Sequence, residues 1–261
     1  MKTIKRTFLI GLMILASAQL SQSQVLISIL FGDKLNTPEL EFGLNGGWSI
    51  SYIRGIDGSK PSHNFELGFY FDYWLKENTP WYLATGVYVK SNLGGSNIPM
   101  DYPGNRVIDD SIYMFFNDFG ATVSKKFNTF YVPINLRYMS KSGFYADAGV
   151  QIGLVFKTID TYTTEISGNE LDYVVKKGVK DNGLYKWFDG GIDAGIGYKS
   201  KSKMGWKIGL YYYVGLTNIY KNDLGPKAYN SSGYILANIP IGKKKAAKER
   251  AEKAAAEAES K

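Results

Sequence analysis

Residues 39–53 read ELEFGLNGGWSISYI and contain the pattern that decides the fold. Every second position is apolar or aromatic, with one glycine among them: Leu40, Phe42, Leu44, Gly46, Trp48, Ile50 and Tyr52. The positions between them carry Glu, Gly, Asn and Ser. Side chains alternate between the two faces of a β-strand, so this period of two predicts a strand with one apolar and one polar face.

The same alternation recurs seven more times along the chain. It occupies residues 63–75, 81–91, 128–139, 143–157, 185–199, 205–217 and 232–242. Eight antiparallel strands are enough to close a small barrel. The sequence therefore predicts an all-β fold, an eight-stranded antiparallel up-and-down β-barrel.

The composition narrows the possible chemistry. The chain has no cysteine and one histidine, but 20 Tyr, 14 Phe, 5 Trp and 29 Gly. Without cysteine there can be no disulfide, thiolate metal site or cysteine nucleophile. His63 lies near Ser59 and Ser62, but no further catalytic motif accompanies it. We expect no enzyme activity and no cofactor or metal.

The N-terminal segment has the features of a secretory signal peptide. Residues 1–7 are basic, residues 8–18 are apolar, and small residues follow. The prediction is a signal peptide over residues 1–23, exported by the Sec route and cleaved after Ser23 or after Ala18. The formal charge of +7 lies mostly at the two ends, because residues 24–242 carry 21 basic and 20 acidic side chains. Export and a nearly neutral body argue against a nucleic-acid partner.

Alternation alone does not say which face points inward, so two barrels compete. One is a soluble lipocalin-like cup with apolar residues inside, and the other is a transmembrane barrel with apolar residues outside. Glycines gather on the polar face: Gly43, Gly47, Gly68, Gly86, Gly149, Gly153, Gly191, Gly195, Gly197, Gly209 and Gly215. Small residues weaken a water-exposed strand surface but make room in a crowded lumen. This distribution favours the transmembrane barrel.

The lengths of the connections point the same way. Short links, residues 76–80, 140–142 and 200–204, alternate with longer ones, of which residues 92–127 and 158–184 are the longest. Bacterial outer-membrane barrels have short periplasmic turns and long extracellular loops. We therefore expect the cell outer membrane as the location, with both mature termini in the periplasm.

Aromatic pairs on the apolar face flank each short turn. They are Tyr73 and Trp81, Tyr138 and Phe144, and Tyr198 and Trp206. Aromatic rings collect where hydrocarbon meets the headgroups, so these six residues predict a membrane girdle in contact with outer-membrane lipid.

The polar face carries the charges expected in the lumen. They are Glu39, Glu41, Glu66, Asp72, Lys90, Arg137, Asp147, Asp189, Asp193 and Lys207. Buried charges must be paired or neutralised, so we expect lumen carboxylates to neutralise Arg137 and Lys207 inside a filled barrel. The alternative interpretation of the acidic excess is a cation or substrate site.

Three stretches resemble the PorT-like outer-membrane β-barrel proteins of Gram-negative bacteria. They are LISILFGDKLNTPELEFGLNGG (residues 26–47), VPINLRY (132–138) and FYADAGVQIGLVF (144–156). The resemblance covers about residues 1–242 and implies the fold and location. It carries no catalytic motif, and some members of the family take part in secretion across the outer membrane. Outer-membrane barrels commonly end in an aromatic residue, whereas here Ile239-Pro240-Ile241-Gly242 is followed by a tail.

The segments on either side of the barrel, residues 39–242, are predicted separately. The lead-in, residues 24–38, is either a short periplasmic helix or an additional strand or irregular segment. Residues 243–261 form a charged tail rich in Ala, Lys and Glu, with opposite charges four positions apart that favour helix. The tail either contacts peptidoglycan or a periplasmic protein or is an inert extension.

These features predict a non-enzymatic outer-membrane barrel whose long extracellular loops serve envelope structure, adhesion or recognition of a ligand or of other envelope proteins. Two alternatives stay open. One is an accessory subunit of an outer-membrane secretion apparatus, and the other is a soluble lipocalin-like binder of a small ligand.

Overall fold

The computed structural model describes residues 36–37, 39–76, 79–102, 105, 110–202, 204–221 and 227–241. The predicted signal peptide, the tail, and the lead-in apart from Asn36 and Thr37 lie outside the described residues. Within the described part, no helix is long and apolar enough to cross a membrane.

The described residues form nine strands and two helices. The strands are β1 (Leu40–Arg54), β2 (Ser62–Trp74), β3 (Trp81–Pro99), β4 (Thr122–Met139), β5 (Phe144–Ile166), β6 (Asn169–Gly178), β7 (Phe188–Lys199), β8 (Lys207–Asn218) and β9 (Tyr229–Pro240). The helices are α3 (Asp110–Asp118) and α4 (Val179–Asn182).

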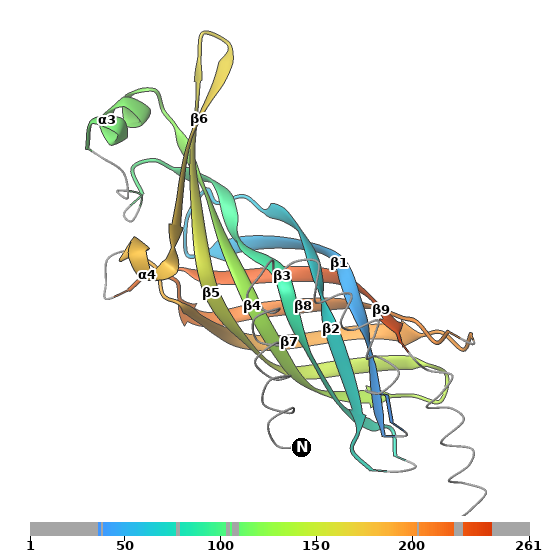
Figure 1. Ribbon diagram of the computed structural model, residues 1–261. Coiled ribbons are helices and arrows are strands. Elements are labelled where there is room, and N and C mark those ends of the chain that lie inside the picture. The colour runs from blue at the N-terminus through green and yellow to red at the C-terminus, as the bar shows by residue number, and fades with distance from the viewer. Residues whose placement is uncertain are drawn as a thin grey trace, which may run out of the picture.

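Eight of these strands close into a ring (Figure 1). Each pairs antiparallel with its neighbours in the order β1-β2-β3-β4-β5-β7-β8-β9, and β9 pairs back with β1. The start of β1 and the end of β9 lie at the same end as the three short turns, since Gly43 pairs with Pro240 and Leu40 with Tyr73. The predicted eight-stranded up-and-down barrel is confirmed.

The polar face of the barrel wall points inward. In β5, Asp147 and Gln151 are buried, whereas Val150 and Leu154 are 47% and 46% exposed. In β8, Lys207 and Tyr213 are fully buried and Leu210 is 54% exposed. Apolar side chains therefore cover the outside, which is the opposite of a cup with an apolar interior.

The wall strands run further than the alternation predicts. β3 continues to Pro99 and β4 begins at Thr122, with α3 between them, inside the connection predicted over residues 92–127. β5 continues to Ile166, turns at Ser167 and Gly168, which both have positive φ, and returns as β6. A bulge hides the continuation of β5 from the alternation pattern. The β4–β5 register shifts between Asn128 and Thr129, and the extra residue in β5 inverts the alternation of that strand beyond Phe156.

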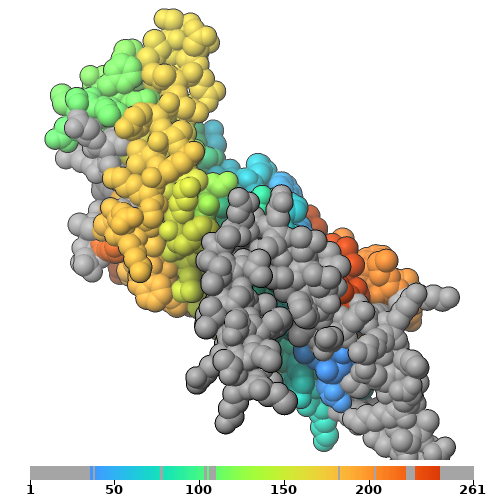
Figure 2. Space-filling model, in the orientation of Figure 1, coloured from blue at the N-terminus to red at the C-terminus, as the bar shows by residue number. Residues whose placement is uncertain are grey.

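The strand extensions and α3 form a lobe beyond the ring, called here the outer lobe (α3 and residues 157–178 of the β5–β6 hairpin). Figure 1 shows the hairpin projecting past the barrel with α3 beside it, and Figure 2 shows this region in green and yellow at the upper left. The ring of Phe116 lies 6.2 Å from that of Tyr162 and 6.1 Å from that of Tyr173. Thr164 Oγ1 donates a 2.8 Å hydrogen bond to the carbonyl of Phe119. These contacts dock α3 on the hairpin.

Glycines on the inner face make room for tyrosine rings. A Cβ atom at Gly195 would overlap the ring of Tyr211, and one at Gly197 would overlap the hydroxyl of Tyr145. A Cβ atom at Gly233 in β9 would meet no other atom of the described residues within 4 Å. The predicted role of lumen glycines therefore has a geometric basis at these positions.

Replacing Gly195 should destabilise the barrel because the added methyl group collides with the Tyr211 ring. We expect Gly195→Ala to lower the free energy of unfolding by about 1–3 kcal/mol, the usual cost of overpacking. The measurement is a urea titration in detergent, followed by the gel mobility of unheated samples. Gly233→Ala is the matched control and should leave the midpoint unchanged; equal midpoints for both variants would contradict the packing.

Candidate functional site

The end of the lumen near the short turns is filled by one ion-pair network. Its acidic members are Glu41 (β1), Asp72 (β2) and Asp147 (β5), and its basic members are Arg137 (β4), Lys199 (β7) and Lys207 (β8). We call these six residues the basal network. Three carboxylates face three cations, so the network is neutral, and it joins six of the eight wall strands.

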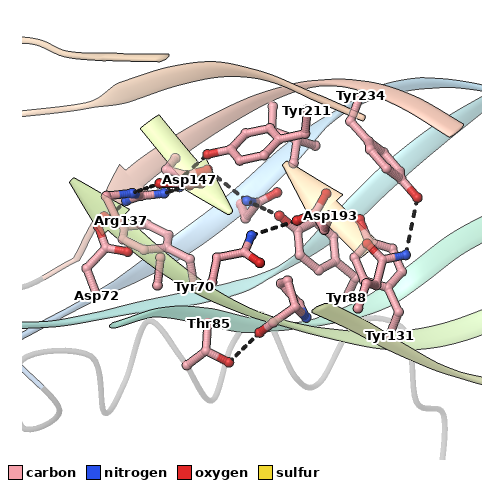
Figure 3. A pocket seen from close by; sticks show the side chains of 17 residues that line it. Tyr70, Asp72, Thr85, Tyr88, Tyr131, Arg137, Asp147, Asp193, Tyr211 and Tyr234 are labelled. Carbon is pink, nitrogen blue, oxygen red and sulfur yellow. Dashed lines mark hydrogen bonds and ion pairs between the residues drawn. The ribbon is translucent and has the colours of Figure 1, made fainter. Parts of the chain in front are cut away.

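Arg137 holds two carboxylates of the basal network, those of Asp72 and Asp147, and Figure 3 shows these three side chains together. Its Nε and Nη2 donate to the two carboxylate oxygens of Asp147, both at 2.7 Å, and its Nη1 donates to Asp72 at 2.5 Å. The guanidinium also lies over the ring of Tyr145, 4.2 Å from its centroid. The planar fork of arginine matches a carboxylate at two points, which makes this pair specific as well as strong.

Lys207 links β8 to β1 and β2 across the lumen. Its Nζ donates to Glu41 at 2.7 Å and to Asp72, and it lies 3.9 Å from the centroid of the Tyr70 ring. Lys199 binds the other oxygen of Glu41 at 2.7 Å. Lys207 is fully buried, so these two carboxylates and the ring replace the water that an ammonium group would otherwise bind.

The middle of the lumen holds three carboxylates with neutral hydrogen-bond donors. Ser49 donates to Glu66 at 2.5 Å, Asn135 to Asp193 at 2.6 Å and Tyr213 to Asp189 at 2.8 Å. None of the three carboxylates forms a salt bridge with a described residue.

Stacked tyrosine rings occupy the space between these carboxylates. Tyr88 and Tyr131 stack with their centroids 4.2 Å apart, and Tyr234 lies 5.9 Å from Tyr131. The cavity left beside them is about 30 Å³, whereas one water needs roughly 10–15 Å³. Side chains therefore fill this part of the lumen, and the cavity has room for about two or three waters.

Lys125, Tyr185 and Asp160 form a buried cluster at the end of the lumen opposite the basal network. Tyr185 accepts a 2.6 Å hydrogen bond from Lys125 and donates to both oxygens of Asp160 at 3.1 and 3.0 Å. Lys125 and Asp160 themselves are 4.0 Å apart. Burial lowers the pKa of Lys125 and raises that of Asp160, although each partner opposes the shift of the other. The tyrosine therefore bridges a weak ion pair.

Two of the ten predicted lumen charges lie elsewhere. Lys90 is exposed on the outside, with its ammonium 5.7 Å from the centroid of the Phe65 ring. The β2–β3 register shifts between Leu67 and Gly68, and this bulge inverts the alternation beyond Tyr88, so the prediction for Lys90 was wrong. Glu39 precedes β1, is partly exposed and accepts a hydrogen bond from Thr37. The other eight face the lumen.

The six residues predicted as a girdle lie on the outside at the short-turn end. Trp81 pairs with Tyr138, their centroids 5.2 Å apart, and Phe144 pairs with Tyr198, also at 5.2 Å. Exposed fractions are 45% for Tyr73, 40% for Trp206 and 64% for Phe144. Their contact with lipid stays a prediction.

A second set of outward aromatics was missed by the sequence analysis. It comprises Trp48, Phe65, Phe130, Phe156 and Phe188, and the rings of Phe130 and Phe156 are 4.7 Å apart. Tyr138 and Phe130 are eight residues apart, and Phe144 and Phe156 twelve. At about 3.3 Å per residue and a tilt of about 40°, these spacings correspond to roughly 20–30 Å, the height of a barrel's apolar band. The spacing from the first set was the signal that could have found them.

His63 is placed on the outer face, with its ring stacked on that of Trp48 at 5.1 Å and an interplanar angle of 3°. Ser59 is partly exposed, and its Oγ atom is buried without a hydrogen-bond partner among the described residues. The only serine–histidine grouping that the sequence offered therefore has no catalytic geometry.

Loss of Arg137 should destabilise the barrel because Asp147 then loses the one cation with which it is paired among the described residues. We expect Arg137→Gln to lower the free energy of unfolding by about 3–5 kcal/mol, the usual cost of breaking a buried pair. The double variant Arg137→Gln with Asp147→Asn should recover much of this loss. Urea midpoints in detergent measure both, with Lys141→Gln in an exposed turn as control. No loss in the single variant would show that the network contributes nothing.

The sequence matches a known family over most of its length. Residues 18–221 match the family described as outer membrane protein beta-barrel domain. No curated protein matches significantly. Solved structures similar to this chain include Ail, the attachment invasion locus protein of Yersinia pestis, in complex with the heparin analogue sucrose octasulfate (11% identity, TM-score 0.40, 78% of this chain and 99% of Ail).

Two further similar structures are Neisserial surface protein A (10% identity, TM-score 0.35, 77% of this chain and 96% of that one) and CarO2 of Acinetobacter baumannii (12%, 0.32, 75% and 98%). The family match covers most of the sequence, including strands β1 to β8 of the ring. The chain belongs to the outer membrane protein β-barrel domain family.

Proposed function

We propose that the protein is a non-enzymatic outer-membrane barrel that recognises an extracellular or envelope partner through its outer lobe. The observation that carries this proposal is the apolar surface of the lobe. On α3, Met114 is 62% exposed and Phe115 41%, and Phe119 just beyond the helix is 50% exposed. The rings of Phe115 and Phe119 are 5.0 Å apart, so the three residues form one patch. Exposed aromatic and methionine side chains are typical of protein interfaces.

A cleft adjoins this patch at the tip of the lobe. It has a volume of about 560 Å³ and is lined by Phe119, Gly120, Thr163, Thr164, Glu165, Gly168 and Glu170. Its size is in the range of ligand pockets. Its lining carries the hydroxyl groups of Thr163 and Thr164 and the carboxylates of Glu165 and Glu170. An apolar patch beside a polar cleft favours recognition of a specific surface.

The filled lumen supports a binding role over transport. The neutral basal network closes one end, and the bridge of Lys125, Tyr185 and Asp160 closes the other. An eight-stranded barrel has an interior just wide enough for its own side chains. Movement of solute through the lumen would require breaking buried ion pairs.

The proposed orientation puts the outer lobe outside the cell and both mature termini in the periplasm, after removal of the signal peptide. The alternation of short turns and long connections supports it. In this orientation the tail would be free to contact peptidoglycan or a periplasmic protein. The outward apolar face argues against the soluble lipocalin-like alternative, because such a cup would bury that face.

The resemblance to PorT-like proteins keeps an accessory role in secretion as the second candidate. Two of the three resembling stretches, residues 132–138 and 144–156, belong to the barrel wall in β4 and β5. The third, residues 26–47, includes the first eight residues of β1. An accessory subunit of this kind would contact its apparatus from the periplasmic side.

Photo-crosslinking in intact cells tests both candidates. A photoreactive amino acid at position 115 in the outer lobe should give a discrete adduct with a surface partner. The same probe at Leu136 on the lipid face should give only lipid adducts. Adding Met114→Ser and Phe119→Ser should abolish the adduct from position 115 while the folded barrel keeps its gel mobility. Protein adducts from position 141 in a short turn, with none from position 115, would contradict the proposal and favour the secretion subunit.

A further inference from the structure

Three lysines gather on the outer surface where the barrel wall passes into the outer lobe. They are Lys126 of β4, Lys157 of β5 and Lys176 of β6, and we call them the lysine patch. Ile159 of β5 pairs with Lys126 on one side and with Lys176 on the other. Residues paired directly across strands point to the same face, and two strand spacings place the lysine backbones roughly 10 Å apart. Lys157 lies two residues before Ile159 on that same face.

The bulge at the top of the wall creates this arrangement. Below it, odd-numbered residues of β5 point inward, as Gln151 and Val155 do. Beyond it, Thr158 and Asp160 are buried, so Lys157 turns outward. A regular strand would have pointed Lys157 into the lumen.

The patch is not neutralised by carboxylates of the described residues. None of its three lysines forms a salt bridge within that part of the chain. Asp160 is buried on the opposite face, and Asp172 pairs with Thr163, four residues further toward the tip than Ile159. One carboxylate, that of Asp181, lies beside Gly178 at the edge, next to the exposed Lys180. The surface therefore keeps a net positive charge.

The patch lies directly beyond the outer set of aromatics. The rings of Phe130 and Phe156 pack together at 4.7 Å, and the next cross-strand pair is Asn128 with Lys157. Aromatic belts mark the boundary of the hydrocarbon layer, so the lysines stand within a few ångströms of the headgroup layer. Lys90, turned outward by its own bulge, lies on the other side of Phe130.

We propose that the lysine patch binds the phosphate groups of a phosphorylated lipid in the outer leaflet. Its acyl chains would lie against Phe130 and Phe156. Ammonium groups bind phosphate as point charges, and lysines near a membrane surface add to the affinity for anionic lipid. Three like charges held on adjacent strands repel one another, and an anion between them removes that repulsion. The inference goes beyond partner recognition by the lobe, and its failure would leave the crosslinking result untouched.

The test is lipid binding by the purified full chain in neutral detergent, measured by native mass spectrometry. The probes are lipid A with two phosphates, the same lipid without phosphate, and inorganic phosphate as competitor. Lys126→Gln, Lys157→Gln and Lys176→Gln combined should weaken binding of phosphorylated lipid A by roughly 100-fold, from the usual contribution of a lysine near a membrane surface. The control combines Lys76→Gln, Lys141→Gln and Lys201→Gln in the three short turns and should leave binding unchanged.

Three results would overturn the inference. They are equal binding by the triple variant and the unaltered chain, equal binding of the phosphorylated and phosphate-free lipids, and displacement of the lipid by inorganic phosphate at comparable concentration. If the triple variant fails to fold, Lys126→Gln and Lys176→Gln are measured singly. Each should weaken binding by about 5-fold, and two unaffected single variants would count equally against the proposal.

Discussion

Compensation of buried charge around Arg137 is the constraint on which the rest of the structure depends. A barrel of eight strands encloses a lumen too narrow for bulk water, so each carboxylate and cation inside must be ion-paired or hydrogen-bonded by side chains of other strands. The basal network meets this condition with three carboxylates and three cations drawn from six strands. Because these residues are far apart in sequence, their pairing requires the ring to be closed in one register. Charges inside leave the apolar face outside, against lipid.

The bulges divide the chain into a wall and a lobe. Below them, the strands alternate regularly and form a closed surface that fits a membrane. Beyond them, β3, β4 and β5 continue without the ring and carry α3 and β6 outward. The same irregularities turn Lys90 and Lys157 from the lumen side to the outer surface. The ion pairs that stabilise the fold thus lie in the lumen. The surfaces suited to recognition, the lysine patch and the outer lobe, lie where the wall ends and beyond it.

The sequence was informative wherever one face of a strand is buried and the other is not. All eight wall strands follow from alternation, and the glycines opposite Tyr145 and Tyr211 identify the inner face. Asp147 as the partner of Arg137 lies across a short turn, but the approach of Asp72 and Lys207 requires the closed ring. β6 is exposed at eight of its ten residues and shows no apolar alternation, and α3 spans only nine residues. Bulges add a single residue without a sequence signature, so Lys90 could not be placed.

The central claim is that the apolar face of the barrel meets lipid while the charges face inward. Trp81 tests it most directly, since its side chain is 42% exposed on that face. The measurement is the fluorescence of a variant that keeps Trp81 as its only tryptophan, reconstituted in vesicles whose acyl chains carry bromine. We expect strong quenching by the brominated chains and little by aqueous iodide. Efficient quenching by iodide and none by bromine, in a protein that stays soluble without detergent, would contradict it.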